Sequence, residues 1–159
     1  RIAAIVDHEP ADGGEPVSVF ETGAILLYLA DKAEQFLPHD LRGQVAATEW
    51  LMWQMGGLGP MMGQHGHFKL FGVMDRRLAK NDYLAGEDYS IADMSCFPWV
   101  QTYKRQEIDL GDFTHVKRWY ETLKQREGLR RGMAVGRDRI NRNPQDDEQA
   151  RKTLFGLKE

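Results

Sequence analysis

Hydrophobic positions recur with two different periods along this chain, and the change of period divides it into two parts. Residues 2–7 and 17–20 are short runs rich in β-branched or other apolar side chains, which is typical of strands. The loop between them holds several turn-forming glycines and prolines, so the two runs are predicted to pair as an antiparallel hairpin. From Ala24 the period becomes helical, and this first helix is expected to end before Pro38.

Helical periodicity continues from Leu41, and the chain turns polar after Arg130. The glycines and the proline within 56–60 are expected to kink or end the first of these helices, because proline removes a backbone donor. Apolar side chains at helical spacing resume over 71–78 and again over 116–123. The pattern therefore predicts an α/β piece joined to an all-helical part.

Ser90 and Asp93 have the spacing of a helix-capping box. Ser90 can accept from the backbone N–H of Asp93, while Asp93 reaches back to the N–H of Ser90. This structural role accounts for Asp93 better than a role as a catalytic acid. Cys96, in the apolar helix that follows, is predicted to be a small buried side chain and not a nucleophile.

Charge and composition narrow the classes of function. The net charge is -3, which disfavours a nucleic-acid partner, because duplex binding usually needs a basic face. No apolar run reaches the roughly 18 residues that a membrane helix needs, so no membrane partner is expected. The single cysteine excludes an internal disulfide and suits a reducing compartment, so a cytoplasmic location is expected.

Glu21 and Thr22 stand between the second strand and the first helix. A helix presents unpaired N–H groups and a partial positive charge at this end. With Thr22 at the N-cap, its N–H and hydroxyl can donate to a ligand carboxylate, while Glu21 offers a negative charge to an ammonium group. The pair suits the free amino-acid end of a ligand, although by itself it is better explained as an ordinary helix cap.

Three motifs, taken in order, resemble those of the cytosolic glutathione transferases. They are the strand-to-helix turn 20–25 (FETGAI), the glycine-rich segment 53–64 (WQMGGLGPMMGQ), and the runs 83–86 (YLAG) and 89–94 (YSIADM). The glycine-rich segment is similar to that of the bacterial Nu class. The resemblance implies a partial thioredoxin-like α/β domain followed by an all-α C-terminal domain.

The resemblance also implies domain boundaries. Residues 1–36 correspond to the C-terminal half of a thioredoxin-like glutathione-binding domain, whose start is expected to be missing from this chain. Residues 41–140 correspond to the all-helical domain, and residues 141–159 are predicted to be a polar tail. About twenty residues, or five to six helical turns, are expected to be absent near 68–69.

Glutathione is the co-substrate that the resemblance implies. In the family an acidic residue and a hydroxyl residue hold the γ-glutamyl group, and Glu21 and Thr22 match that pair. The residue before a cis-proline pairs through its backbone with the cysteinyl part, and Ile2 matches it, although Ala3 replaces the proline. The catalytic group, which stabilises the glutathione thiolate, is expected in the missing N-terminal segment.

An apolar pocket for the second substrate is a further expectation. Candidates to line it are Trp53, Met55, Met61, Met62 and Phe68, although plain core packing explains these side chains about equally well, and His65 is a further candidate at its border. His65 and His67 form an H-x-H pair without a third ligand at a clear spacing, so no metal is expected.

The function that the resemblance implies is enzymatic. The protein is expected to be a homodimeric glutathione transferase that uses the glutathione thiolate on a small disulfide, hydroperoxide or electrophile. Disulfide-bond reductase and peroxidase chemistry is expected most for a Nu-like protein. The alternative is a non-catalytic binding or regulatory module with the same fold, because a fold does not determine a function.

Overall fold

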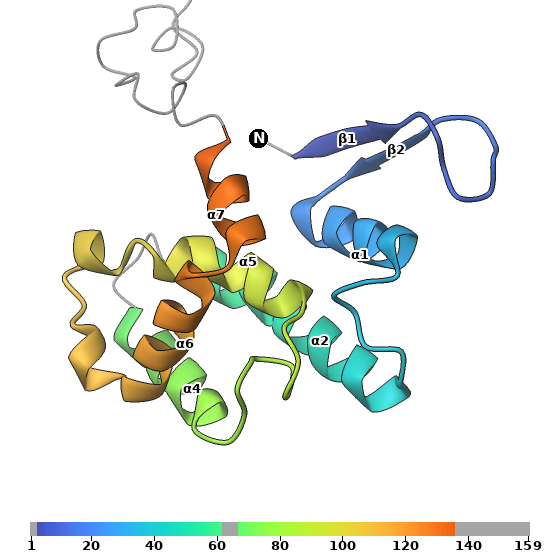
Figure 1. Cartoon of the computed structure of the whole chain (residues 1–159). Helices are drawn as coiled ribbons and strands as arrows, with labels where there is room; N and C mark the ends of the chain where they lie inside the picture. Colours follow the sequence, from blue (N-terminus) through green and yellow to red (C-terminus); the bar gives the residue numbers. More distant parts are fainter. Residues whose placement is uncertain (1–2, 62–66, 136–159) are drawn as a thin grey trace, which may run out of the picture. The chain divides into compact units, whose positions relative to one another are not determined.

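The computed structural model describes residues 3–61 and 67–135. The chain forms two compact units, residues 1–123 and residues 124–159. All the described strands and most of the described helices (Figure 1) belong to the first unit. The second unit contributes one described helix, α7 (Glu127–Ala134), which was not predicted from the sequence. Its Glu127 and Arg131 form an ion pair at i,i+4 spacing, with 3.8 Å between nitrogen and oxygen.

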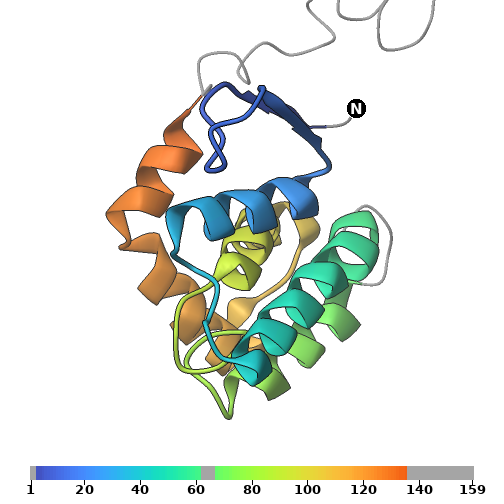
Figure 2. The same ribbon diagram turned by 90° about the vertical axis from the view of Figure 1, so that its right-hand side faces the viewer.

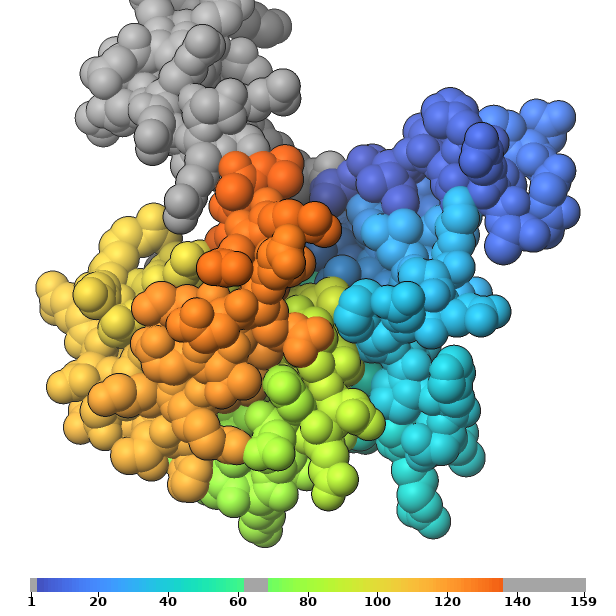
Figure 3. Space-filling model, viewed as in Figure 1, coloured from blue at the N-terminus to red at the C-terminus, as the bar shows by residue number. Residues whose placement is uncertain are grey.

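The predicted hairpin is confirmed. Strand β1 (Ala4–Asp7) pairs antiparallel with β2 (Val17–Phe20), with Ala4 opposite Phe20 and Asp7 opposite Val17. None of the residues of these two strands is buried. In the view of Figure 3 the surface of the hairpin is exposed. Val6 and Phe20 are 53% and 62% exposed. The peptide bonds between described residues are all trans.

Helix α1 (Thr22–Ala33) is attached to the hairpin by a polar contact at the end of β1. The Asp7 carboxylate accepts from the hydroxyl of Tyr28, at 2.7 Å, and from the ammonium group of Lys32. These contacts hold the pKa of the Asp7 carboxyl at about 2, well below its ordinary value of 3.8. The cluster therefore joins strand and helix most strongly when Asp7 is ionised.

Helix α2 (Leu41–Trp53) begins at the N-cap Asp40, whose side chain accepts from the N–H of Gly43 at 2.9 Å. The glycine-containing segment after it does not end the helix abruptly. It forms a π-helical turn, η1 (Gln54–Leu58), followed by the short α3 (Gly59–Met61). The N–H of Gly59 donates to the carbonyl of Gln54, five residues earlier, as a π-turn requires.

The remaining described helices of the first unit are α4 (His67–Leu78), α5 (Ile91–Val100) and α6 (Thr114–Lys124), with two 3₁₀ turns, Tyr103–Gln106 and Leu110–Asp112, before α6. The junction expected near 68–69 lies inside α4, which is helical through both residues. Within these described ranges, no helix combines the length and apolar character that crossing a lipid bilayer needs.

Helix α5 lies at the centre of the packing, against α1, α2 and the π-turn, and Figure 2 shows α1 passing across it. Ala30 of α1, Leu51 of α2 and Ile91 of α5 meet in a buried cluster, where burial of each large apolar side chain stabilises the fold by about 1.5–3 kcal/mol. The apolar face predicted over 116–123 is confirmed. Its buried members are Val116, Trp119, Tyr120 and Leu123.

Candidate functional site

The turn between β2 and α1 has an unusual backbone at Glu21. Its N–H donates to the carbonyl of Ala3, at 3.1 Å, and its carbonyl accepts from the N–H of Ile25, at 2.9 Å. Glu21 is therefore both the last residue of the hairpin ladder and the N-cap of α1, and its φ is 71°. Positive φ is costly for a residue with a side chain, and such strain is concentrated at functional sites. The prediction of Thr22 as the N-cap is wrong, because Thr22 is the first helical residue.

The first turn of α1 has no side-chain cap. Its N–H groups and partial positive charge are thus available to a ligand, and Glu21 and Thr22 are both exposed. An anionic group can bind at this turn, with the Glu21 carboxylate beside it for a cationic group. The absence of a cap argues against the ordinary structural explanation of the Glu21–Thr22 pair.

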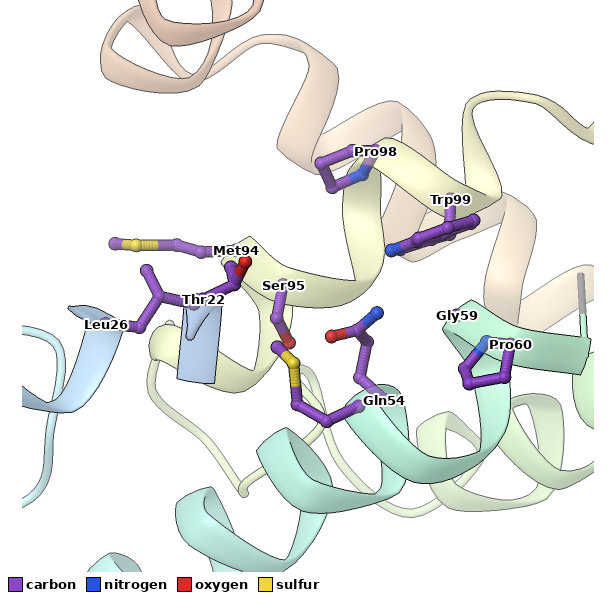
Figure 4. A pocket seen from close by; sticks show the side chains of 10 residues that line it. Thr22, Leu26, Gln54, Gly59, Pro60, Met94, Ser95, Pro98 and Trp99 are labelled. Carbon is purple, nitrogen blue, oxygen red and sulfur yellow. The ribbon is translucent and has the colours of Figure 1, made fainter. Parts of the chain in front are cut away.

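A pocket of about 480 Å³ opens beside Thr22 (Figure 4). Three regions of the chain build it: α1, the π-turn with the start of α3, and the middle of α5. Its lining is mainly apolar, and no lining side chain is ionisable. The lining residues are Thr22, Leu26, Gln54, Met55, Gly59, Pro60, Met94, Ser95, Pro98 and Trp99.

Most of the residues predicted for the second-substrate pocket either do not line this pocket or lie outside the residues that the structure describes. The half-buried Trp53 packs edge-on against Trp50, with 5.2 Å between ring centroids, and Met61 is exposed at the end of α3. Neither lines this pocket, so their role in substrate binding stays a prediction. Ile2, Met62 and His65 lie outside the described residues, as does the side chain of Phe68.

Sequence reasoning missed most of the residues that line the pocket. Met55 is among the predicted candidates and lines this pocket, whereas its neighbour Gln54 is not among them. Met94 and Trp99 are on α5, far away in sequence. The signal available for them was the position of α5 directly after a strong capping box, which places that helix firmly but does not say what it faces.

The capping box itself is confirmed. One oxygen of Asp93 accepts from the N–H and hydroxyl of Ser90, at 3.0 and 3.2 Å. The other accepts from the N–H of Leu84, at 3.0 Å, and from the indole of Trp119, at 2.8 Å. Burial raises the pKa of the Asp93 carboxyl, and all four donors oppose that shift. A carboxylate so fully engaged is a structural group and not a catalytic acid.

Cys96 is buried, as predicted, and burial raises the pKa of its thiol far above the ordinary value. The thiolate is the nucleophilic form of cysteine, so this thiol is unreactive. Among the side chains that the structure describes, no group of three or more His, Cys, Asp or Glu could hold a metal ion.

The sequence and the fold match known proteins. The family profile described as "Glutathione S-transferase, C-terminal domain" matches residues 62–127. The disulfide-bond oxidoreductase YfcG of Escherichia coli K12 is 48% identical over 146 residues, covering 79% of this chain and 68% of the relative. The disulfide-bond oxidoreductase YghU of the same organism is 34% identical over 164 residues, covering 86% and 56%.

A solved structure is also similar. It is a glutathione transferase from Burkholderia graminis with two glutathione molecules bound per subunit, with 36% sequence identity and a TM-score of 0.78. The similarity covers 84% of this chain and 67% of that one. The chain thus spans about two thirds of YfcG and of the Burkholderia protein, and just over half of YghU.

Proposed function

The chain belongs to the glutathione S-transferase superfamily, and from this premise we propose that it binds glutathione and takes part in glutathione-dependent disulfide reduction. The observation that carries the proposal is the uncapped, strained turn at Glu21 and Thr22 beside an uncharged pocket. The names of the two Escherichia coli relatives support the choice of disulfide chemistry. Hydroperoxides and other small electrophiles are further acceptors for the same thiolate.

The proposed binding mode uses complementary charges. The α-carboxylate of the γ-glutamyl group accepts from the free N–H groups and the hydroxyl at Thr22, and the Glu21 carboxylate pairs with the α-ammonium. Ile2, through its backbone, is proposed to align the cysteinyl part. These contacts fix one end of the tripeptide, so the sulfur is held in a restricted region and does not diffuse freely.

The proposed reaction is thiol–disulfide exchange. The glutathione thiolate attacks one sulfur of the substrate disulfide. A new sulfur–sulfur bond forms as the old one breaks, and the departing thiolate takes up a proton. A second glutathione thiolate then releases the other half of the substrate, so two glutathione molecules become one glutathione disulfide. The group that stabilises the thiolate is proposed to lie in the third of the family's length that this chain does not match.

The absence of about twenty residues near 68–69 remains a proposal, and the alignment with YfcG supports it. Seventy-nine per cent of this 159-residue chain is about 126 residues, about 20 fewer than the 146 residues of the alignment. The relative therefore has internal positions without a counterpart in this chain.

A homodimer is proposed from a stripe of side chains on α2, in which Leu41, Val45 and Met52 are exposed and Thr48 is half-buried. Leu41, Val45, Thr48 and Met52 recur at i, i+4, i+7 and i+11, so they lie along one side of the helix. They border a shallow groove of about 450 Å³ together with Gln44 and Glu49. An apolar stripe with a polar margin suits a self-complementary interface between two copies of the chain.

Glutathione titration of the Glu21→Ala, Thr22→Ala double variant tests the binding site. Loss of these groups is expected to weaken glutathione about 10- to 100-fold, because charge-assisted hydrogen bonds are lost. Glu15→Ala, which removes an exposed glutamate from the hairpin loop, serves as the matched control and should bind as the unaltered protein does. Unchanged affinity in the double variant would contradict the assignment.

A turnover measurement distinguishes the two hypotheses, a catalytic glutathione transferase and a non-catalytic regulatory module. The full-length protein is expected to reduce a small disulfide such as bis(2-hydroxyethyl) disulfide at the expense of glutathione. Tight glutathione binding without any turnover on disulfides, hydroperoxides or electrophiles would favour the non-catalytic module.

A further inference from the structure

The first turn of α1 packs closely against two methionines, Met52 at the end of α2 and Met55 in the π-turn. Gly23, the second residue of α1, is buried. A Cβ at Gly23 would lie 3.4 Å from Cγ and 3.7 Å from Sδ of Met55, and 3.6 Å from Cε of Met52. These are van der Waals distances, so the two methionines leave room for little more than one carbon beside the glycine.

Met55 connects this turn to the interior of the first unit. Its side chain also packs against the buried cluster of Ala30, Leu51 and Ile91, which holds it in place. The side chain of Met52, by contrast, is 46% exposed. Of the two methionines, Met55 is therefore the one that can fix the first turn of α1 relative to the packed helices.

The backbone at Glu21 needs such a support, because its φ is 71°. A strained conformation persists only where the surrounding structure fixes it. On one side, the bond from the N–H of Glu21 to the carbonyl of Ala3, at 3.1 Å, ties the turn to the hairpin. On the other side, two residues later, Met55 lies against Gly23. The free donors of α1 begin at Thr22, between these two supports.

We propose that Met55 is a positioning residue for glutathione. By packing against Gly23, it holds the free N–H groups of this turn where the α-carboxylate of the γ-glutamyl group accepts from them. The inference rests on the proposed function, because it assigns a support to the site at Glu21 and Thr22. Hydrogen bonds weaken steeply as their angles depart from linear, so a small displacement of the turn lowers the affinity for glutathione. Met55 acts through the backbone and does not need to touch glutathione.

Calorimetric titration of glutathione into variants of the full chain tests the contact. Gly23→Val adds two carbons beyond the Cβ and is expected to weaken glutathione about 5- to 30-fold, because overpacking displaces the turn. Met55→Ala removes the two nearest atoms, so the double variant Gly23→Val, Met55→Ala should recover to within about 3-fold of the unaltered protein. Gly128→Val is the matched control, at the second residue of α7, where nothing lies within 4 Å of an added Cβ. Its affinity should equal that of the unaltered protein.

Backbone amide signals report the position of the turn without glutathione. The ¹H–¹⁵N signals of Thr22 and Ala24 should shift in Gly23→Val and return toward their original positions in the double variant. A merely structural role for Met55 would change the midpoint of thermal unfolding without this reversal.

Three results would overturn the inference: unchanged glutathione affinity in Gly23→Val, a double variant that binds as weakly as Gly23→Val, or amide shifts that do not reverse. An unaltered protein that binds no glutathione would contradict the proposed function itself. The amide signals would still decide, in that case, whether Met55 positions the turn.

Discussion

At the scale of a single residue, the Asp93 side chain holds several segments of the chain together. Its four hydrogen bonds connect the start of α5, the loop at Leu84 and the middle of α6. A single carboxylate therefore fixes three segments that are separate in sequence. Since the donors are buried with it, removing the carboxylate leaves several polar groups unpaired at once.

Asp93→Asn is accordingly expected to lower the free energy of unfolding by about 2–4 kcal/mol, because an amide nitrogen replaces one of the accepting oxygens. Urea denaturation followed by circular dichroism measures the change. Asp88→Asn, an exposed position in the loop before the capping box, is the control and should stay within about 0.5 kcal/mol of the unaltered protein. Equal stabilities for the two variants would contradict a structural role for the buried carboxylate.

The ionisation of Asp7 predicts a pH dependence at the same scale. Its pKa is lowered to about 2 in the folded chain by Lys32, Tyr28 and the N–H of Glu9. A depressed carboxyl pKa contributes stability above the unfolded value, near 4, and that contribution disappears as the pH falls toward 2. The carboxyl carbon of Asp7 should therefore titrate with a midpoint of about 2 by NMR. In Lys32→Met the midpoint should move up toward 3.8, and an unmoved midpoint would show that Lys32 is not the main cause.

At the scale of elements, α6 obtains its N-terminal cap from another helix. One oxygen of Asp75, on α4, accepts from the N–H groups of His115 and Val116 at 2.8 and 3.1 Å. The donors at the start of α6 are thus paired by a side chain forty residues away. This contact couples the formation of α6 to its packing against α4.

Asp75→Ala should cost about 0.5–2 kcal/mol of stability, the usual range for a lost N-cap. Amide hydrogen exchange is the more informative measurement, because protection should fall first at the N-terminal turn of α6. Asp112→Ala, at an exposed aspartate just before α6, is the control. If protection against hydrogen exchange fell equally throughout α6 and α5, the loss of stability would be global. The loss of the Asp75 cap on α6 would then not be its cause.

The elements that were predictable from the sequence are those determined by local chemistry. The hairpin, the capping box at Ser90 and the buried face at 116–123 each follow from turn residues, cap spacing or apolar periodicity. The N-cap of α1 was placed one residue too late, because the ladder bond to Ala3 extends the hairpin as far as Glu21. That bond joins residues distant in sequence and leaves no local signal.

The pocket was harder to predict for a similar reason. Trp53 and Met61 are predicted from side-chain type, but the π-turn between them changes the direction of Met61 relative to Trp53. Glycines within a helical segment indicate an irregularity, but they do not determine whether the helix kinks, ends or forms a π-turn. The opposite wall of the pocket comes from α5, and a contact between distant helices has no trace in the local periodicity.

At the scale of the whole molecule, the stripe on α2 predicts the state of association. Val45→Glu places a charge at the middle of the stripe and is expected to convert the proposed homodimer to a monomer, since burying an unpaired carboxylate opposes association. Sedimentation equilibrium measures the mass. Val135→Glu, the same change at an exposed valine on the second unit, is the control. A dimer of unchanged stability in Val45→Glu would place the interface elsewhere.

The π-turn at Gln54–Leu58 has a consequence for how this chain can change during evolution. A wide turn holds one residue more than an α-helical turn, so deleting a single codon there would restore the regular helix and leave the later positions facing as they do now. The pocket wall would change where the π-turn supplies Gln54 and Met55. The shape of this pocket can therefore diverge between lineages through one insertion or deletion, while Glu21 and Thr22 stay the same.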